Sequence, residues 1–219
     1  MNEGETLSII GTSGSGKSTI LRTLNRLIPT TSGEIEFRGK NIMDIPVIEL
    51  RRQIGYVLQE PALFPHWTTE KNIELVPRLV GWSKEKIAER VQELLELMQL
   101  PYKTYGARYP SELSGGEKQR IGIARALAAK PDLVLFDEPF SALDPITRAD
   151  LQQEILRLKQ KLKTTSVFVT HDVKEAFLLG DRVLILDHGK MIQTGTPKEI
   201  MNNPVNDFAE KFIATEYEL

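Results

Sequence analysis

A glycine-rich segment near the amino terminus carries the residues best suited to hold a phosphate. Residues 11–18 read Gly-Thr-Ser-Gly-Ser-Gly-Lys-Ser, between an apolar run and a helical pattern. Glycines let backbone N–H groups curl around a phosphate, and a helix amino terminus adds partial positive charge. Lys17 would reach the β and γ oxygens of a triphosphate, and Ser18 could ligate Mg²⁺. The predicted phosphate ligands are Gly11, Ser13, Gly14, Ser15, Gly16, Lys17, Ser18 and Thr19.

Two acidic residues follow a strongly apolar stretch at 133–136. An apolar run of this kind predicts a buried strand, whose carboxyl end faces the crevice where α/β sheets bind ligands. We expect Asp137 to hold Mg²⁺, directly or through water. Glu138 would act as the general base that polarises an attacking water.

A second pair of glycines, Gly115 and Gly116, lies at a predicted helix start. Ser114 and Glu117 form the pattern of a capping box around them. Capping does not account for the glycines, since each costs about 1 kcal/mol in a helix relative to alanine. We therefore expect something to approach this backbone closely, as at an anion site. One mononucleotide cannot occupy two cradles separated by a helical segment, which suggests a dimer with shared sites.

Short apolar runs alternate with amphipathic stretches, a pattern that predicts an α/β fold with a mostly parallel sheet and flanking helices. The predicted strands are 7–10, 54–58, 133–136, 166–170 and 182–186, and the predicted helices are 17–27, 83–97, 115–129, 145–162 and 173–179. The apolar positions Ile87, Val91, Leu94 and Met98 follow helical spacing.

The stretch 60–113 contributes no convincing strand and is interpreted as an inserted helical subdomain. The chain is then a single domain over 1–219, with an α/β core at 1–59 and 114–219. A small hairpin around 191–193 and a helix capped by Thr196 and Pro197 follow the last predicted parallel strand.

Composition excludes several other functions. The net charge is −2, which argues against a nucleic-acid partner bound through its phosphates. The chain has no cysteine, so disulfides, thiolate nucleophiles and cysteine-ligated metals are excluded. Since no apolar run approaches the length of a membrane span, a membrane role would need a partner.

The segment 113–120, Leu-Ser-Gly-Gly-Glu-Lys-Gln-Arg, resembles the signature motif of ATP-binding cassette (ABC) ATPases, which are P-loop NTPases. Three further motifs match in order: Gln59 resembles the Q-loop glutamine, 141–144 the D-loop and His171 the switch histidine. The resemblance implies a head-to-tail homodimer, or a pair with another ATPase subunit, around two ATP molecules. Each ATP would lie between Lys17 of one chain and Ser114, Gly115 and Gly116 of the other.

The resemblance also implies roles for single residues. The catalytic residues would be Lys17, Gln59, Glu138 and His171, the Mg²⁺ ligands Ser18, Gln59 and Asp137, and Asp144 a further nucleotide contact. Simpler interpretations remain open, since Gln59 could be a surface residue and His171 a loop or capping residue. Asp144 also precedes Pro145 as an N-cap, and we expect it to serve both purposes.

Residues 25–28, 31–35 and 144–148 are similar to ATPases of importers for glycine betaine, choline or carnitine. That class implies a peripheral location on the cytoplasmic face of the membrane, attached to permease subunits and served indirectly by a solute-binding protein. The apolar run Leu63-Phe64-Pro65-His66-Trp67 is either core or a contact with the permease.

Three alternatives remain. The chain could serve an importer of another small solute such as an amino acid, or it could be a soluble ABC switch protein without a permease. Family members begin with two strands and an adenine-stacking aromatic residue, and we expect both features to be missing before Gly11. Loss of that stacking would weaken nucleotide binding roughly 5- to 150-fold, which would make the chain a defective nucleotide binder.

Overall fold

The computed structural model describes residues 1–217, which form two compact units. The first unit comprises Met1–Leu50, Leu135–Glu138 and Thr164–Leu219, and the second comprises Arg51–Val134 and Pro139–Lys163. Each unit is therefore assembled from segments that are far apart in the sequence. The predicted boundaries of the single domain and of its helical subdomain at 60–113 stay a prediction.

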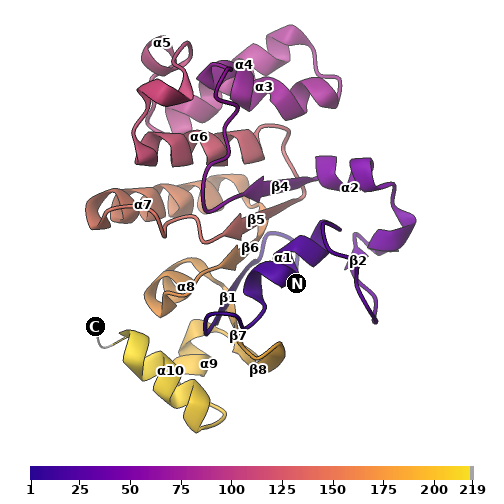
Figure 1. Ribbon diagram of the computed structural model, residues 1–219, viewed down its shortest axis with the longest axis vertical. Coiled ribbons are helices and arrows are strands. Elements are labelled where there is room, and N and C mark those ends of the chain that lie inside the picture. The colour runs from indigo at the N-terminus through magenta and orange to yellow at the C-terminus, as the bar shows by residue number, and fades with distance from the viewer. Residues whose placement is uncertain (218–219) are drawn as a thin grey trace. The chain divides into compact units, whose positions relative to one another are not determined.

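The first unit is built on a sheet with the strand order β5-β6-β1-β7-β8 (Figure 1), to which β5 (Leu133–Asp137) contributes its last three residues. The central strand β1 (Thr6–Gly11) pairs in parallel with β6 (Thr165–Val169) and with β7 (Arg182–Asp187). β8 (Lys190–Gly195) pairs antiparallel with β7 and forms the expected hairpin. The predicted α/β class with a mostly parallel sheet is confirmed.

Apolar side chains from the sheet and from the carboxyl-terminal helices form one core in this unit. Ile10 of β1 and Ile185 of β7 are fully buried and pack with Val173 and Ala209. The remaining elements of the unit are α1 (Lys17–Leu24), β2 (Glu36–Phe37), β3 (Lys40–Asn41), η1 (Ile42–Asp44), the first part of α2 (Val47–Arg52), α8 (Val173–Leu179), α9 (Pro197–Asn202) and α10 (Asp207–Tyr217).

Helix α1 ends earlier than predicted. The pattern predicts helix to Leu27, whereas α1 ends at Leu24 with Asn25 as its C-cap. Arg26 has a φ of 56°, in the left-handed region, which turns the chain out of the helix. The backbone N–H of Leu27 donates to the carbonyl of Arg22 at 2.7 Å and closes the last turn. The other predicted elements lie where expected, within about one or two residues.

The second unit combines helices with β4 (Ile54–Val57) and with Leu133 and Val134, the first two residues of β5. Its helices are α3 (Thr69–Leu79), α4 (Lys84–Leu97), α5 (Tyr102–Tyr105), η2 (Pro110–Glu112), α6 (Gly115–Leu127) and α7 (Pro145–Leu162). In the part of the chain that the structure describes, no helix has both the length and the apolar character that a membrane crossing requires.

Helix α4 buries the face that its spacing predicts. Ile87, Val91, Leu94 and Met98 are each at most 5% exposed. Arg90, on the same helix and 5% exposed, donates to the carbonyl of Leu127 at 2.9 Å. A guanidinium at this position satisfies backbone carbonyls at the carboxyl end of α6 and complements its dipole.

One buried amide defines the path of the loop before α3. Asn72, fully buried, accepts a hydrogen bond from the backbone N–H of Phe64 at 2.8 Å. Its amide nitrogen donates to the carbonyls of Phe64, Trp67 and Thr68 at 3.2, 3.2 and 3.0 Å. The rings of Phe64 and Trp67 lie with centroids 4.6 Å apart on this loop. A single side chain therefore replaces the backbone partners that this irregular segment lacks.

We expect Asn72→Ala to lower the free energy of unfolding by about 2–4 kcal/mol, since it leaves backbone groups of the loop without a partner. Guanidinium denaturation followed by tryptophan fluorescence measures the change. Gln92→Ala, on the exposed face of α4, serves as the control. A midpoint for Asn72→Ala equal to that of the control would show that the loop does not depend on this amide.

Candidate functional site

The loop between β1 and α1 is shaped by close backbone approaches. A β-carbon at Gly11 would lie 2.0 Å from the carbonyl oxygen of Leu186, so only glycine fits there. The N–H of Ser15 donates to the carbonyl of Thr12 at 3.1 Å, which makes the turn tight. Gly16, which precedes α1, has a φ of 102°, a conformation that favours glycine. These positions give the loop the form of a phosphate cradle at a helix amino terminus.

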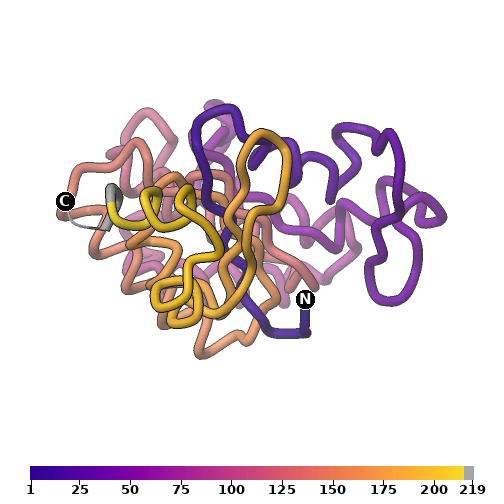
Figure 2. The backbone as a smooth tube through the Cα atoms, turned by 90° about the horizontal axis from the view of Figure 1, so that it is seen from below, coloured from indigo at the N-terminus to yellow at the C-terminus, as the bar shows by residue number. Residues whose placement is uncertain are grey.

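The turn between β7 and β8 holds this loop. The hydroxyl of Thr12 donates to Oδ1 of Asp187 at 3.1 Å, and the N–H of Gly189 donates to the carbonyl of Ser15 at 3.0 Å. Figure 2 shows the orange hairpin turn beside the indigo loop. Ser15 is only 2% exposed. Ser15, one of the predicted phosphate ligands, therefore has its side chain inside the protein.

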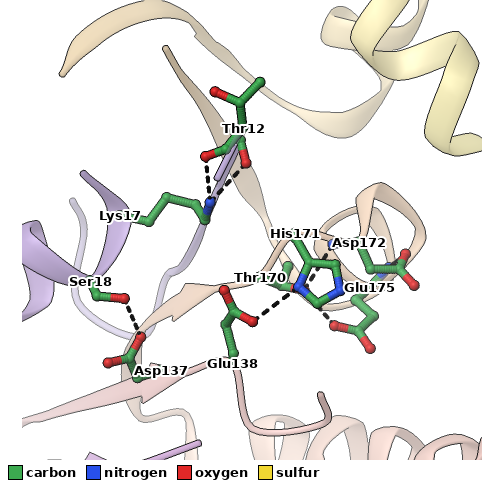
Figure 3. Close-up of polar contacts among 10 residues, drawn as sticks. Thr12, Lys17, Ser18, Asp137, Glu138, Thr170, His171, Asp172 and Glu175 are labelled. Carbon is green, nitrogen blue, oxygen red and sulfur yellow. Dashed lines mark hydrogen bonds and ion pairs between the residues drawn. The ribbon is translucent and has the colours of Figure 1, made fainter. Parts of the chain in front are cut away.

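Lys17 points back over the loop (Figure 3). Its ammonium donates to the carbonyls of Gly11 and Thr12 at 2.8 and 3.0 Å. Burial lowers the pKa of Lys17, while the negative charges of Glu138 and Asp137 oppose that shift. The side chain thus places a positive charge at the mouth of the cradle, where it can exchange carbonyl partners for phosphate oxygens.

Ser18 and Asp137 form a pair of oxygen ligands. The hydroxyl of Ser18, in the first turn of α1, donates to Oδ1 of Asp137 at 2.8 Å (Figure 3). Asp137 is the last residue of β5, as the sequence pattern predicts. Hydroxyl and carboxylate oxygens are the ligand types that Mg²⁺ takes, together with phosphate oxygens and water. The two side chains fit a magnesium site beside the cradle.

Glu138 and His171 lie opposite Lys17 at the ends of neighbouring strands. Nδ1 of His171 and Oε2 of Glu138 are 3.0 Å apart, and the two side chains are 61% and 23% exposed (Figure 3). The N–H of Glu138 donates to the carbonyl of Val169, the last residue of β6, at 2.9 Å. Glu138 adopts a φ of 46°, an uncommon conformation that is often found at functional sites.

These residues enclose one cavity of about 440 Å³. Its lining includes six of the eight predicted phosphate ligands and all three predicted catalytic residues of this unit, namely Ser13, Gly14, Gly16, Lys17, Ser18, Thr19, Glu138 and His171. The arrangement combines a cation, backbone donors and a carboxylate with a histidine. It can bind a polyphosphate and activate a water molecule next to it.

Four of the five predicted residues of the second unit, all except Gln59, lie at the starts of helices. Ser114 caps α6: its Oγ accepts from the N–H of Glu117 at 3.3 Å, and Oε2 of Glu117 accepts from the N–H of Ser114 at 2.7 Å. The hydroxyl of Tyr105 donates to the other oxygen of Glu117 at 2.7 Å. The capping box is confirmed.

The two glycines of α6 have different surroundings, which corrects the expectation that an external group explains both. A β-carbon at Gly116 would lie 2.5 Å from Cγ2 of Thr147, so Gly116 is required by packing within the chain. A β-carbon at Gly115 would have no atom of the described residues within 4 Å. Only Gly115 therefore remains without an internal reason to be glycine.

Asp144 caps α7, as predicted. Its Oδ1 accepts from the N–H groups of Ile146 and Thr147, both at 3.1 Å. Hydrogen bonds from the side chain and backbone of Thr147 hold the pKa of Asp144 below its usual value. Gln59 follows β4 and is exposed, and the preceding carbonyl, of Leu58, accepts from Gln119 at 3.2 Å.

Several residues around the cavity were not predicted from the sequence. Thr12 and Asp187 fix the cradle, and Thr170 and Glu175 hydrogen bond behind His171. Thr12 lies at a variable position of the glycine-rich pattern, and the other three carry no motif. Only the pairing of β1 with β6 and β7 brings them to the site.

Comparisons with known proteins show which family the chain belongs to. The model of the family described as ABC transporter matches residues 1–141. The chain is 54% identical over 214 residues to the glycine betaine/carnitine/choline transport ATP-binding protein of Bacillus subtilis, covering 98% of this chain and 56% of that one. It is 50% identical to the glycine betaine uptake system ATP-binding protein of Escherichia coli, covering 96% and 68%. The chain thus spans little more than half of the Bacillus relative.

Two solved structures are also similar. One is the dimeric ATP-binding cassette MJ0796 in a post-hydrolysis state bound to ADP and Pi, with a TM-score of 0.79 and 35% identity, covering 90% of this chain and 87% of that one. The other is cbiO1 from Clostridium perfringens, part of an ABC transporter complex, with a TM-score of 0.84 and 28% identity, covering 100% and 84%.

The packing at Gly116 yields a test within one chain. We expect Gly116→Ala to destabilise the protein by about 1–3 kcal/mol, because the added methyl group overlaps Thr147. Thr147→Ser removes the opposing methyl group and keeps a hydroxyl, so the double variant should recover most of the loss. Thermal unfolding of the four proteins in the cycle measures the coupling. Strictly additive effects of the two substitutions would contradict the contact.

Proposed function

Because the chain belongs to the ABC transporter family, we propose that it is an ATP-hydrolysing subunit that couples ATP turnover to import of a small solute. The observation that carries this proposal is the cavity in which Lys17, Ser18, Glu138 and His171 meet. A cradle alone would support nucleotide binding. The carboxylate and histidine beside it support hydrolysis.

The triphosphate of ATP would lie along the loop between β1 and α1. Backbone N–H groups of the loop and of the first turn of α1 would bind its β-phosphate, aided by the helix dipole. Lys17 would turn from the carbonyls of Gly11 and Thr12 to the β and γ oxygens. The exchange keeps the ammonium hydrogen bonded throughout, which lowers the cost of its burial.

Ser18 and Asp137 would hold Mg²⁺ beside the bound phosphates. The role of Gln59 as a further ligand that senses the nucleotide stays a prediction. When bound, the ion neutralises charge on the phosphates and fixes their orientation. The two protein oxygens already share one hydrogen bond at 2.8 Å. To bind a cation, the Ser18 hydroxyl would only have to rotate its hydrogen away from Asp137.

Glu138 would orient a water molecule for in-line attack on the γ-phosphorus. The new bond forms between the water oxygen and phosphorus while the bond to the β,γ-bridging oxygen breaks, which leaves ADP and phosphate. Glu138 would accept the water proton, and His171 would donate a hydrogen bond to the γ-phosphate. The 3.0 Å contact between the two side chains keeps them on the same side of the reacting group.

A second copy of the chain, or a paired ATPase subunit, would complete the site. Its Ser114, Gly115 and Gly116 would approach the γ-phosphate, with Asp144 at the same interface. The open space at Gly115 supports this role, because nothing within the described residues uses it. The dimeric cassette bound to ADP and Pi, to which the chain is similar, supports the same assembly.

The transported solute would be a quaternary-ammonium osmoprotectant, such as glycine betaine, choline or carnitine. The names of the relatives from Bacillus subtilis and Escherichia coli support this choice. The subunit would sit at the cytoplasmic face of the membrane through permease subunits, supplied indirectly by a solute-binding protein. The aromatic loop held by Asn72, in which Phe64 is 38% exposed, would contact the permease.

Co-purification separates this importer role from that of a soluble switch protein. A detergent-solubilised permease recovered with the chain would support import, whereas recovery with soluble partners only would favour the switch. Transport assays of the reconstituted complex with glycine betaine and with an amino acid would then identify the solute class.

We expect Glu138→Gln to bind ATP within about twofold of the wild-type affinity and to lower turnover by about 10²- to 10⁴-fold, because the amide cannot accept the water proton. Phosphate release measures turnover, and titration with a fluorescent ATP analogue measures affinity. Glu89→Gln, an exposed residue of α4, is the control. Normal turnover by Glu138→Gln would remove this residue from its proposed role.

We expect Gly115→Ala to fold as stably as the wild type, because within the described residues its methyl group would meet no atom within 4 Å outside its own helical turn. Turnover per chain should fall about tenfold, since the methyl group would lie between two copies.

Turnover per chain of the wild type should also fall on dilution below the dimer dissociation constant. Light scattering in ATP measures dimer formation alongside turnover. Turnover that stays constant on dilution would contradict a shared site.

A further inference from the structure

The position of His171 depends on its backbone, because its ring is largely exposed. The side chain is 61% exposed and lies 3.0 Å from Glu138. An exposed ring of this kind has few neighbours to restrict its rotamers. Whatever fixes the residues on either side of His171 therefore decides where its ring can reach.

Both flanking residues are held by a buried hydrogen-bonded relay (Figure 3). The hydroxyl of Thr170 donates to Oε2 of Glu175 at 2.6 Å, and Thr170 Oγ1 accepts from the N–H of Asp172 at 3.1 Å. Thr170 is 3% and Glu175 6% exposed. The relay spans His171, since it joins the residue before the histidine to the residue after it.

The relay differs from the other caps of this chain. In α6 and α9 the glutamate at the third helical position accepts directly from the N–H of the N-cap residue, with Glu117 to Ser114 and Glu199 to Thr196 both at 2.7 Å. In α8 the N-cap is Asp172 and Glu175 is the third residue, but the hydroxyl of Thr170 stands between them.

Helix capping alone does not require this inserted hydroxyl. Oδ1 of Asp172 already accepts from the N–H groups of Lys174 and Glu175 at 2.7 and 3.1 Å. A glutamate that bonded directly to the N–H of Asp172 would complete the usual box, as in α6 and α9. The added consequence of the relay is that the side chain of Thr170 cannot move without breaking a buried hydrogen bond to a carboxylate.

We propose that Thr170 and Glu175 are positioning residues for His171, and through it for its contact with Glu138. This inference rests on the proposed ATP hydrolysis. By holding the backbone on both sides of the histidine, the relay keeps the imidazole within reach of the γ-phosphate. Misplacement by about 1 Å of a group that contacts the reacting atoms can cost up to about 10²-fold in rate.

The test compares Thr170→Val, which keeps the shape and removes the hydroxyl, with Thr170→Ser, which keeps the hydroxyl. We expect Thr170→Val to lower kcat about tenfold with the KM for ATP changed less than about twofold, and Thr170→Ser to restore most of kcat. Ser166→Ala is the matched control, because it removes a buried hydroxyl near the other end of β6. A purely structural role would lower the melting temperature without this kcat effect and without rescue by serine.

A second measurement needs no turnover. The chain has three histidines, so the ring signals of His66, His171 and His188 can be followed separately by NMR. Thr170→Val should shift the His171 ring signal of the nucleotide-free protein and leave the other two unchanged. An unchanged His171 signal would overturn the inference even if ATP hydrolysis is established. Lack of ATP turnover by the wild type would instead overturn the proposed function. The His171 ring signal would in that case still show whether Thr170 positions His171.

Glu175→Gln covers the case in which Thr170→Val does not fold. Its amide oxygen can still accept a hydrogen bond from Thr170, but it carries no negative charge. We therefore expect a smaller fall in kcat, about threefold, and a shift of the His171 signal in the same direction as in Thr170→Val. A Glu175→Gln protein equal to the wild type in both measurements would overturn the part assigned to Glu175.

Discussion

Burial of the Lys17 ammonium among the carbonyl oxygens of its own loop is the interaction on which the first unit depends. A charge removed from water needs partners, and the carbonyls of Gly11 and Thr12 provide them. Those carbonyls can converge only because the loop turns tightly, with no β-carbon at Gly11 to meet β7. The hydrogen bond from Thr12 to Asp187 then ties the loop to the same strand. Burial lowers the pKa of Lys17, while the carboxylates of Glu138 and Asp137 oppose that shift.

The sequence predicted the main elements and the tight glycine-rich turn before α1 because their signals are local. Apolar runs that end in Asp or Gly, and caps such as Asp144 before Pro145, depend on neighbouring residues alone. The paired strands β2 and β3 were missed, since two-residue strands carry no periodicity. The end of α1 was wrong because the left-handed conformation of Arg26 has no residue-type signal. Thr170 and Glu175 escaped notice because their roles depend on contacts with each other and with Asp172 rather than on a motif.

The two glycines of α6 lie in different surroundings, which helix propensity alone does not predict. Helix propensity marks both as costly, but it does not say what compensates the cost. For Gly116 the compensation is internal, a close fit against the methyl group of Thr147. The same threonine hydrogen bonds with Asp144. The start of α6 and the start of α7 are therefore joined through one side chain, so a displacement of either start acts on the other.

Asn72 recognises only main-chain atoms of the loop that it holds. A hydrogen bond to a main-chain atom does not depend on which side chain that residue carries. The outward-facing side chains of that loop can therefore be replaced one at a time while the loop keeps its course. A lineage could in this way vary the chemistry of this surface without first passing through unfolded intermediates.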